Sequence, residues 1–135
     1  MNKSFWIIIS AFALVVVGVR LYVGHSTSEP AVTVVDVKVP ELSQVAALGA
    51  RDFEANCVSC HGENASGTEN GPPLVHDIYR PGHHPDYAFR TAAKAGVRAH
   101  HWRFGNMPPQ PEVTAEEINR IIVYVRELQK ENGIL

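Results

Sequence analysis

The strongest constraint on this chain is the segment Cys57-Val58-Ser59-Cys60-His61, which holds both cysteines of the sequence. Two thiols separated by two residues are typical of a thioredoxin-like redox site, of half a zinc site or, when histidine follows directly, of covalent haem attachment. A zinc site needs further thiolates or well-spaced imidazoles, and the helical downstream sequence does not match a thioredoxin-like pattern. We therefore predict that Cys57 and Cys60 form thioethers with one haem c and that His61 binds its iron.

An apolar or small-residue run from Phe5 to Val23, broken only by Arg20, predicts a membrane segment. As a helix it would extend about 29 Å, close to the thickness of a bilayer core. A secretory signal peptide is the alternative, with Lys3 as its charged start, but no A-x-A cleavage site follows it. We expect a retained single-pass anchor over residues 1–24, with the remainder exported, because c-type haem is attached outside the cytoplasm.

The predicted organisation is the anchor, a linker over residues 25–40 and one helical domain over residues 41–135. The linker contains prolines and a valine alternation, which fits either a tether or a short strand laid against the domain. Apolar residues at three- and four-residue spacings predict a first helix over residues 41–56. Within it, Gly49 is either a mild helix defect or a point where another helix approaches closely.

Residues 62–77 are rich in glycine and small polar residues, which predicts a loop. Near its end, the carbonyl of Pro72 is a candidate acceptor for the second ring N–H of His61, because a histidine that binds metal usually donates that hydrogen to a carbonyl or carboxylate. The pattern then predicts a helix over residues 87–95 that ends at Gly96.

The last helix is the most clearly marked one. Thr114 and Glu117 have the spacing of a capping box, and a stop signal stands at Asn132-Gly133. Between these signals, one apolar stripe consists of Ile118, Ile121, Ile122, Val125 and Leu128.

Met107 is the one methionine besides Met1, and it lies in Gly105-Asn106-Met107-Pro108-Pro109. Methionines that fill a core fall on periodic apolar faces, whereas this one stands in a stiff loop, so we predict that it is the second axial ligand. Histidines are its competitors. They are His76, His83, His84, His100 and His101. The adjacent pairs His83-His84 and His100-His101 also fit a copper or zinc site, and surface histidines without function are the other interpretation.

Together these motifs resemble the class I cytochrome c family, and in particular its membrane-anchored bacterial members with one haem. The matching segments occur in the family's order: Gly49-x-x-x-Phe53-x-x-x-Cys57, Cys57-x-x-Cys60-His61-Gly62, Gly71-Pro72-Pro73-Leu74, Met107-Pro108-Pro109 and Ile121-x-x-Tyr124. The resemblance implies an all-α domain around one covalent haem, with Pro72 and Leu74 among the haem-binding residues.

The resemblance also implies specific contacts. Gly49 and Phe53 are expected to pack against Ile121 and Tyr124, where the first and last helices cross. Trp102 is a looser match to a residue beside the haem propionates, because the segment with the two histidine pairs departs from the commonest short members.

These features predict a one-electron carrier rather than an enzyme, because an iron with both axial positions filled has no site for a substrate. We expect it on the periplasmic face of the bacterial cytoplasmic membrane, anchored by residues 5–23, with membrane redox proteins as partners. The alternatives are a haem subunit of a larger respiratory oxidase or dehydrogenase complex and a sensor in which Met107 dissociates and a small ligand binds.

Charge bears on the partners. The chain has 12 basic and 14 acidic side chains, and no basic tract indicates nucleic-acid binding. Residues 79–111 are nevertheless locally positive, which predicts docking to an acidic partner surface. This segment holds Arg80, Arg90, Lys94, Arg98 and Arg103 against Asp86.

Overall fold

The computed structural model describes residues 34–135. The predicted anchor and residues 25–33 of the linker lie outside the described residues. Within residues 34–135, no helix combines the length and hydrophobicity that crossing a bilayer requires. This part of the chain consists of helices and loops, and its extended backbone pairs at a single isolated bridge, between Val97 and Met107. The all-α prediction is therefore confirmed for the described domain.

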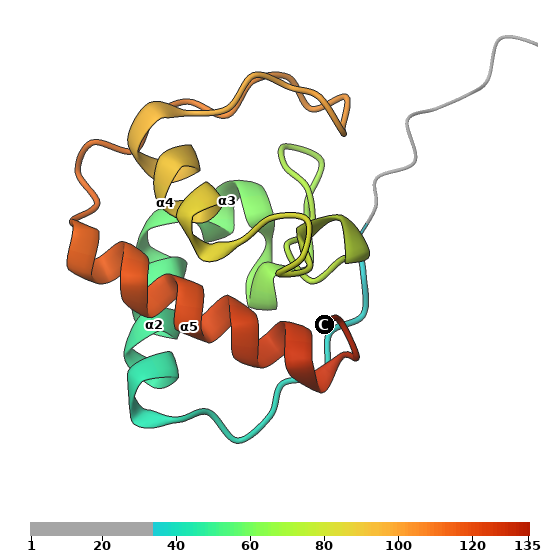
Figure 1. The fold of residues 1–135 in the computed structure, drawn as a ribbon, viewed down its shortest axis with the longest axis vertical. Helices are drawn as coiled ribbons and strands as arrows, with labels where there is room; N and C mark the ends of the chain where they lie inside the picture. Colours follow the sequence, from blue (N-terminus) through green and yellow to red (C-terminus); the bar gives the residue numbers. More distant parts are fainter. Residues whose placement is uncertain (1–33) are drawn as a thin grey trace, which may run out of the picture. The chain divides into compact units, whose positions relative to one another are not determined.

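Four α-helices and two short 3₁₀ segments form the described domain (Figure 1). In chain order they are α2 (Gln44–Asn56), α3 (Val58–His61), η1 (Glu63–Ala65), η2 (Asp77–Tyr79), α4 (Asp86–Ala95) and α5 (Ala115–Glu131).

The helix ends follow from local signals. The first helix begins three residues later than the spacing predicted, because the Ser43 side chain caps it by accepting from the Ala46 N–H at 3.2 Å. The capping box of α5 is present, with Thr114 and Glu117 bonded reciprocally. Gly96 ends α4 with φ 74°, as predicted, because a left-handed residue there closes the last turn.

Helices α2 and α5 cross in close contact, and Gly49 lies at the crossing. A Cβ atom added to Gly49 would overlap the backbone carbonyl of Arg120, so only glycine allows the two backbones to approach this closely. One turn further, the rings of Phe53 and Tyr124 meet with centroids 5.6 Å apart. The close-approach interpretation of Gly49 and the contacts implied by the family resemblance are thus confirmed.

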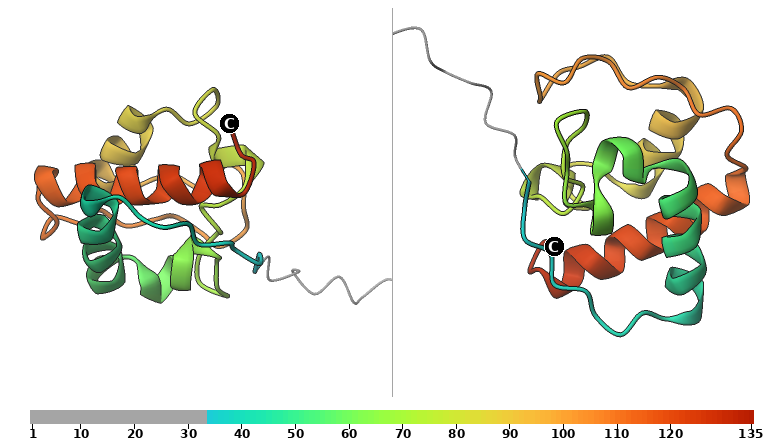
Figure 2. Two further views of the ribbon diagram at one scale, coloured as in Figure 1. Left: turned by 90° about the horizontal axis from the view of Figure 1, so that it is seen from below. Right: turned by 180° about the vertical axis from the view of Figure 1, so that it is seen from behind.

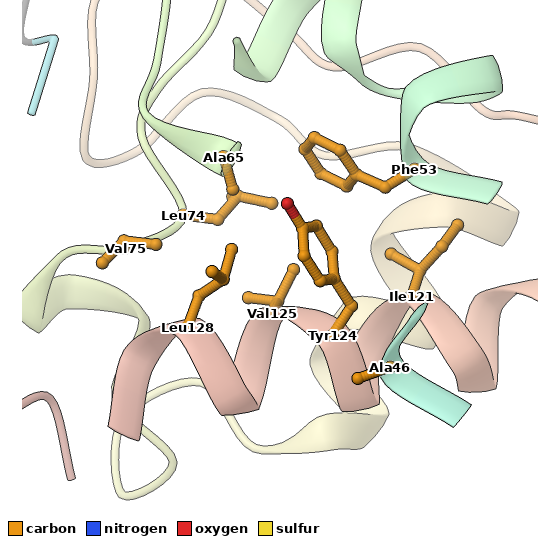
Figure 3. Packing of buried hydrophobic residues seen from close by; sticks show 9 residues of the cluster. All are labelled: Ala46, Phe53, Ala65, Leu74, Val75, Ile121, Tyr124, Val125 and Leu128. Carbon is orange, nitrogen blue, oxygen red and sulfur yellow. The ribbon is translucent and has the colours of Figure 1, made fainter. Parts of the chain in front are cut away.

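The core forms around this crossing and extends toward the loop after η1 (Figure 3). Apolar side chains of α5 supply much of it, so the predicted stripe is confirmed. The buried cluster consists of Ala46, Phe53, Ala65, Leu74, Val75, Ile121, Tyr124, Val125 and Leu128. Ile118 and Ile122 are also buried.

Residues 34–40, the described part of the predicted linker, are neither a free tether nor a strand. They run extended beside the C-terminal end of α5, shown in cyan in Figure 2. The Val35 N–H donates to the Ser66 carbonyl at 2.9 Å, and Lys38 exchanges two hydrogen bonds with the Asn132 side chain. Val35 and Val37 pack against the core. The packed domain therefore begins before residue 41.

Candidate functional site

A cavity of about 420 Å³ opens between α4, α5 and the segment that carries the two cysteines. Its size is in the range of about 300–1,000 Å³ that is usual for cofactor sites. Apolar side chains make up most of its wall. From the cysteine side it is lined by Phe53, Cys57, His61, Pro72 and Leu74, from α4 by Ala88, Phe89, Ala92 and Ala93, from the following loop by Val97, Trp102, Phe104 and Met107, and from α5 by Ile118, Ile121 and Ile122.

The cysteine segment forms a single turn at the cavity wall. Helix α2 ends at Asn56, Cys57 follows as its cap, and α3 places His61 one turn later. The two cysteines do not form a disulfide with each other. Cys57 is half-buried and lines the cavity, whereas Cys60 is exposed and does not. The Cys60 carbonyl accepts from the Thr68 hydroxyl at 2.6 Å, so the loop after α3 holds this turn in place.

The electrostatics of Cys57 argue against a thiolate site. Burial, and then the nearby Cys60, raise the pKa of the Cys57 thiol to about 11. Reactive cysteines have lowered pKa values, because the thiolate is the nucleophile. The local environment therefore disfavours a reactive, thioredoxin-like thiolate at Cys57.

His61 is oriented for metal binding by one hydrogen bond. Its Nδ1 lies 2.9 Å from the Pro72 carbonyl oxygen, which can only accept, so Nδ1 carries the hydrogen and Nε2 keeps its lone pair. Burial lowers the pKa of His61, an effect that the Pro72 bond partly opposes, and the neutral imidazole is the form that binds metal. The predicted contact between Pro72 and His61 is present.

Met107 reaches the cavity from a loop that the backbone holds on both sides. The amides of Val97 and Met107 exchange hydrogen bonds of 2.9 and 3.0 Å with each other's carbonyls. The Gln110 N–H donates to the Ala93 carbonyl at 2.7 Å, which ties the end of the loop to α4. The predicted ligands His61 and Met107 therefore line the same cavity from two different segments of the chain.

Trp102 and Tyr79 lie together at the cavity, where Trp102 donates from Nε1 to the Tyr79 hydroxyl at 3.1 Å. Burial raises the pKa of Tyr79 to about 12, although the bond from Trp102 acts in the opposite direction. At neutral pH the Tyr79 hydroxyl therefore keeps its proton, and both side chains of the pair are uncharged. Leu74, the remaining predicted cofactor residue, is buried and lines the cavity.

The two histidine pairs meet in space. His83 Nε2 and His101 Nε2 are 3.3 Å apart, and the rings of His84 and His101 have centroids 5.2 Å apart. Loss of hydration, followed by the neighbouring His100, His84 and His83, lowers the pKa of His101. Sequence spacing did not indicate this meeting, because 18 residues separate His83 from His101.

Two polar residues of α5 that the sequence reasoning missed hold the wall between η2 and α4. The Arg126 guanidinium donates to the carbonyls of Tyr79 and His84 at 2.8 and 2.6 Å and to Asp86 at 2.9 Å. Gln129 is buried and donates to the Leu74 carbonyl at 2.8 Å. For Gln129 the sequence did contain a signal. It follows Val125 of the apolar stripe by four positions, so the two residues lie on the same face of the helix.

The residues present fit a haem c. An apolar cavity of cofactor size is lined by a thiol, by a neutral imidazole with its tautomer fixed and by a thioether, while the second thiol stands one turn away. Thiols for thioethers and an imidazole with a thioether for the iron are the donor types that c-type haem uses.

Comparison with known proteins agrees with this chemistry. The model of the family described as Cytochrome c matches residues 46–129. The chain is 35% identical over 94 residues to the Cbb3-type cytochrome c oxidase subunit FixP of Sinorhizobium medicae, a match that covers 66% of this chain and 32% of that protein. It is 32% identical over 87 residues to the Cbb3-type cytochrome c oxidase subunit CcoP of Rubrivivax gelatinosus, covering 63% and 26% of the two chains.

The matched part spans about a third of the length of these curated relatives or less. No solved structure matches significantly. The family model covers well over half of the chain, from α2 into the last turn of α5, and includes every residue that the sequence predicts to bind haem or its iron. The chain therefore belongs to the cytochrome c family, as a class I c-type cytochrome.

Proposed function

We propose that this protein carries single electrons on one haem c, attached through thioethers of Cys57 and Cys60 and ligated by His61 and Met107. When bound, the haem supplies a one-electron Fe(III)/Fe(II) couple. The observation that carries the proposal is the placement of His61 and Met107 on one apolar cavity, with the His61 tautomer set by Pro72.

The chain's own residues supply ligands, orientation and exclusion of water. The Pro72 carbonyl directs the His61 lone pair away from itself, and the Val97 bridge holds the Met107 backbone. The apolar wall from α4 and α5 keeps water from the metal environment. If His61 and Met107 both bind the iron, no position would remain for a substrate, and electron transfer would be favoured over catalysis.

Membrane attachment is a further part of the proposal. The apolar run over residues 5–23 would anchor the domain to the bacterial cytoplasmic membrane, with the haem domain on the periplasmic face. Anchoring would keep the carrier beside membrane redox proteins and raise its effective concentration there. Extraction with sodium carbonate tests it. We expect the protein to stay with the membranes, and release into the carbonate wash would contradict a spanning anchor.

A fixed subunit is the second candidate function. The relatives FixP and CcoP are named as subunits of a cbb3-type cytochrome c oxidase, and this chain matches about a third of their length or less. A haem subunit of such a complex would pass electrons by the same chemistry but would stay bound to its partners. Purification in mild detergent separates the two ideas, because a fixed subunit co-purifies with other chains in constant ratio and a free carrier does not.

The decisive test of the electron-carrier proposal uses the full chain expressed in cells that attach haem c. We expect a mass increase of one haem, lost in the double variant Cys57→Ser/Cys60→Ser and kept in Ser59→Ala, whose exposed side chain lies between the two cysteines. Redox titration should give a one-electron transition, and CO should bind the reduced protein slowly or not at all. A chain without added mass would contradict haem attachment, and rapid CO binding would favour the sensor.

A further inference from the structure

We propose that His83, His84 and His101 form a binding site for a divalent transition-metal ion at the rim of the cavity, separate from the proposed haem ligands. One ring nitrogen from each of the three histidines lies within 4.8 Å of the other two. Two of the three side chains, His84 and His101, also line the cavity. The site is reachable from solvent, because His83 and His101 are exposed and His84 is half-buried.

The spacing of one nitrogen pair, on His83 and His101, matches tetrahedral coordination. Zinc binds imidazole nitrogen at about 2.0–2.1 Å, so two ligands on one tetrahedron are separated by about 3.3–3.4 Å. The Nε2 atoms of His83 and His101 are 3.3 Å apart. A hydrogen bond between two neutral rings would allow this distance as well, but it would leave His84 without a role in the cluster.

His84 has the orientation expected of a metal ligand. Its Nδ1 lies 2.6 Å from the Ile78 carbonyl oxygen, so Nδ1 donates and Nε2 keeps its lone pair. A backbone carbonyl is a usual partner for the second nitrogen of a metal-binding histidine, because it fixes the tautomer and raises the basicity of the ligand. This tautomer agrees with coordination through Nε2.

Hydrogen bonds hold the backbone of His83 and His84 and tie down the loop just before His101. The amides of His83 and His84 both donate to the Arg80 carbonyl at 2.9 Å, and the His84 carbonyl accepts from Arg126 at 2.6 Å. On the other segment, the Ala99 N–H donates to the Asn106 side chain at 2.9 Å, two residues before His101. Closing the three nitrogens around an ion therefore calls for side-chain rotation and not for rearrangement of this backbone.

Three imidazoles without a carboxylate select the kind of ion. Imidazole suits zinc, copper and nickel, whereas magnesium and calcium take oxygen ligands. A site with three protein ligands keeps a position for water or another ligand, as open zinc sites do. The inferred occupant is one zinc-like divalent ion per chain.

Titration of the purified full-length, haem-loaded protein with Zn²⁺ alone tests this site, by calorimetry and by zinc content after dialysis. We expect one Zn²⁺ per chain, and an affinity at least tenfold weaker in His83→Ala and in His101→Ala. Removing a residue that only hydrogen-bonds to a metal ligand already lowers metal affinity by about 10–100-fold, so removing the ligand itself should lower it at least as much. Mg²⁺ at the same concentration should not compete. The haem absorption spectrum, recorded throughout, reports that each variant is folded.

His100→Ala is the matched control, since it removes a neighbouring imidazole that does not belong to the group of three whose ring nitrogens lie within 4.8 Å of one another. It should keep the affinity of the parent protein. The proposal is overturned if no zinc binds, if the variants at His83 and His101 bind as well as the parent, or if His100→Ala loses affinity to the same degree. Zinc binding that changes the haem spectrum by displacing an axial ligand would also overturn a separate site.

Discussion

At the scale of single residues, the site is positioned by backbone atoms more than by side chains. The His61 imidazole is set by the carbonyl of Pro72, and the Met107 backbone pairs with that of Val97. Backbone groups of this kind persist when most side chains change, so the geometry tolerates variation around it. The donor atoms do not share this tolerance, because a thioether or imidazole has no replacement of the same chemistry.

Met107 is therefore the residue at which a conservative change should have the largest effect. We predict that Met107→Leu, which keeps the volume closely, lowers the reduction potential and allows rapid CO binding, because the thioether that favours Fe(II) is gone. The measurements are a redox titration and flash photolysis of the CO complex. Phe104→Leu, a change in the same loop without a donor atom, should leave both values near those of the parent. An unchanged potential in Met107→Leu would exclude methionine ligation.

At the scale of elements, the C-terminal end of α4 and the loop that carries Met107 are packed directly against each other. Gly96 ends α4 with φ 74°, and a Cβ atom added there would lie 2.6 Å from the Met107 carbonyl oxygen. That contact is too short for a real Cβ atom, so any other residue would push the loop outward. Helix termination and the position of the proposed axial ligand are thus set by the same glycine.

The Gly96→Ala variant tests this coupling. Alanine at positive φ lowers the stability of the fold by about 1–2 kcal/mol at any position. At Gly96 it would in addition displace Met107. We expect faster CO binding and a weaker sulfur-to-iron absorption band in Gly96→Ala. Gly133→Ala, at φ 75° with nothing near its Cβ position, should show the conformational cost alone. Equal CO kinetics in the two variants would contradict the coupling.

The crossing of α2 and α5 leads to a second prediction at this scale. Gly49→Ala forces a methyl group against the Arg120 backbone, so we expect the free energy of unfolding to fall by about 1–3 kcal/mol, as in overpacked cores. Denaturant unfolding followed by circular dichroism measures it. Gly82→Ala, with nothing near the added Cβ atom, should change the stability by less than about 0.5 kcal/mol. A loss below that value at Gly49 would mean that the helices separate without cost.

Local patterns predicted the elements well, because caps, stop signals and periodic apolar positions act within a few residues. Thr114 begins α5 and Gly96 ends α4 as expected. Pairings across the chain were not predictable in this way. The bridge from Val97 to Met107, the docking of Val35 on Ser66 and the meeting of His83 with His101 depend on how loops close in three dimensions.

The candidate site likewise has a part that the sequence predicts and a part that it does not. That Cys57, His61 and Met107 share one site was predictable because their types and order carry the chemistry, and all three line the cavity. The residues that shape its wall were not predictable in this way. Arg126 and Gln129 belong to the latter, since a polar residue on an amphipathic helix is more often simply solvated. In the structure, they connect α5 to the carbonyls of Tyr79 and Leu74.

At the scale of the whole molecule, the charge balance and the local charge near the cavity differ in sign. The chain has a formal net charge of −2, yet the segment of residues 79–111 is positive. Its one acidic side chain, Asp86, is paired with Arg126 of α5 at 2.9 Å. Within residues 34–135, the recorded ion pairs involve Arg120 and Arg126 and none of the basic side chains of that segment.

Arg98 and Arg103 lie within the 97–107 loop, each next to residues that line the cavity. We therefore expect them near the place where electrons would enter or leave. A small anionic redox reagent shows whether the local positive charge or the negative net charge controls the rate of electron transfer. If the local field decides, an anionic iron cyanide complex should oxidise the reduced protein faster at low salt than at high salt, because screening weakens attraction. If the net charge decides, the anion is repelled and its rate rises with salt.

The double variant Arg98→Glu/Arg103→Glu should reverse the salt dependence of the oxidation rate with the anionic reagent, measured by stopped flow. Lys38→Glu/Lys130→Glu changes the net charge by the same amount but acts on exposed side chains near the C-terminal end of α5, away from the 97–107 loop (Figures 1 and 2). That control should slow the reaction little and keep the sign of the salt effect, because charges beyond a Debye length of about 10 Å are screened. Equal effects of the two double variants would mean that net charge alone steers the encounter, and a positively charged docking face would then be excluded.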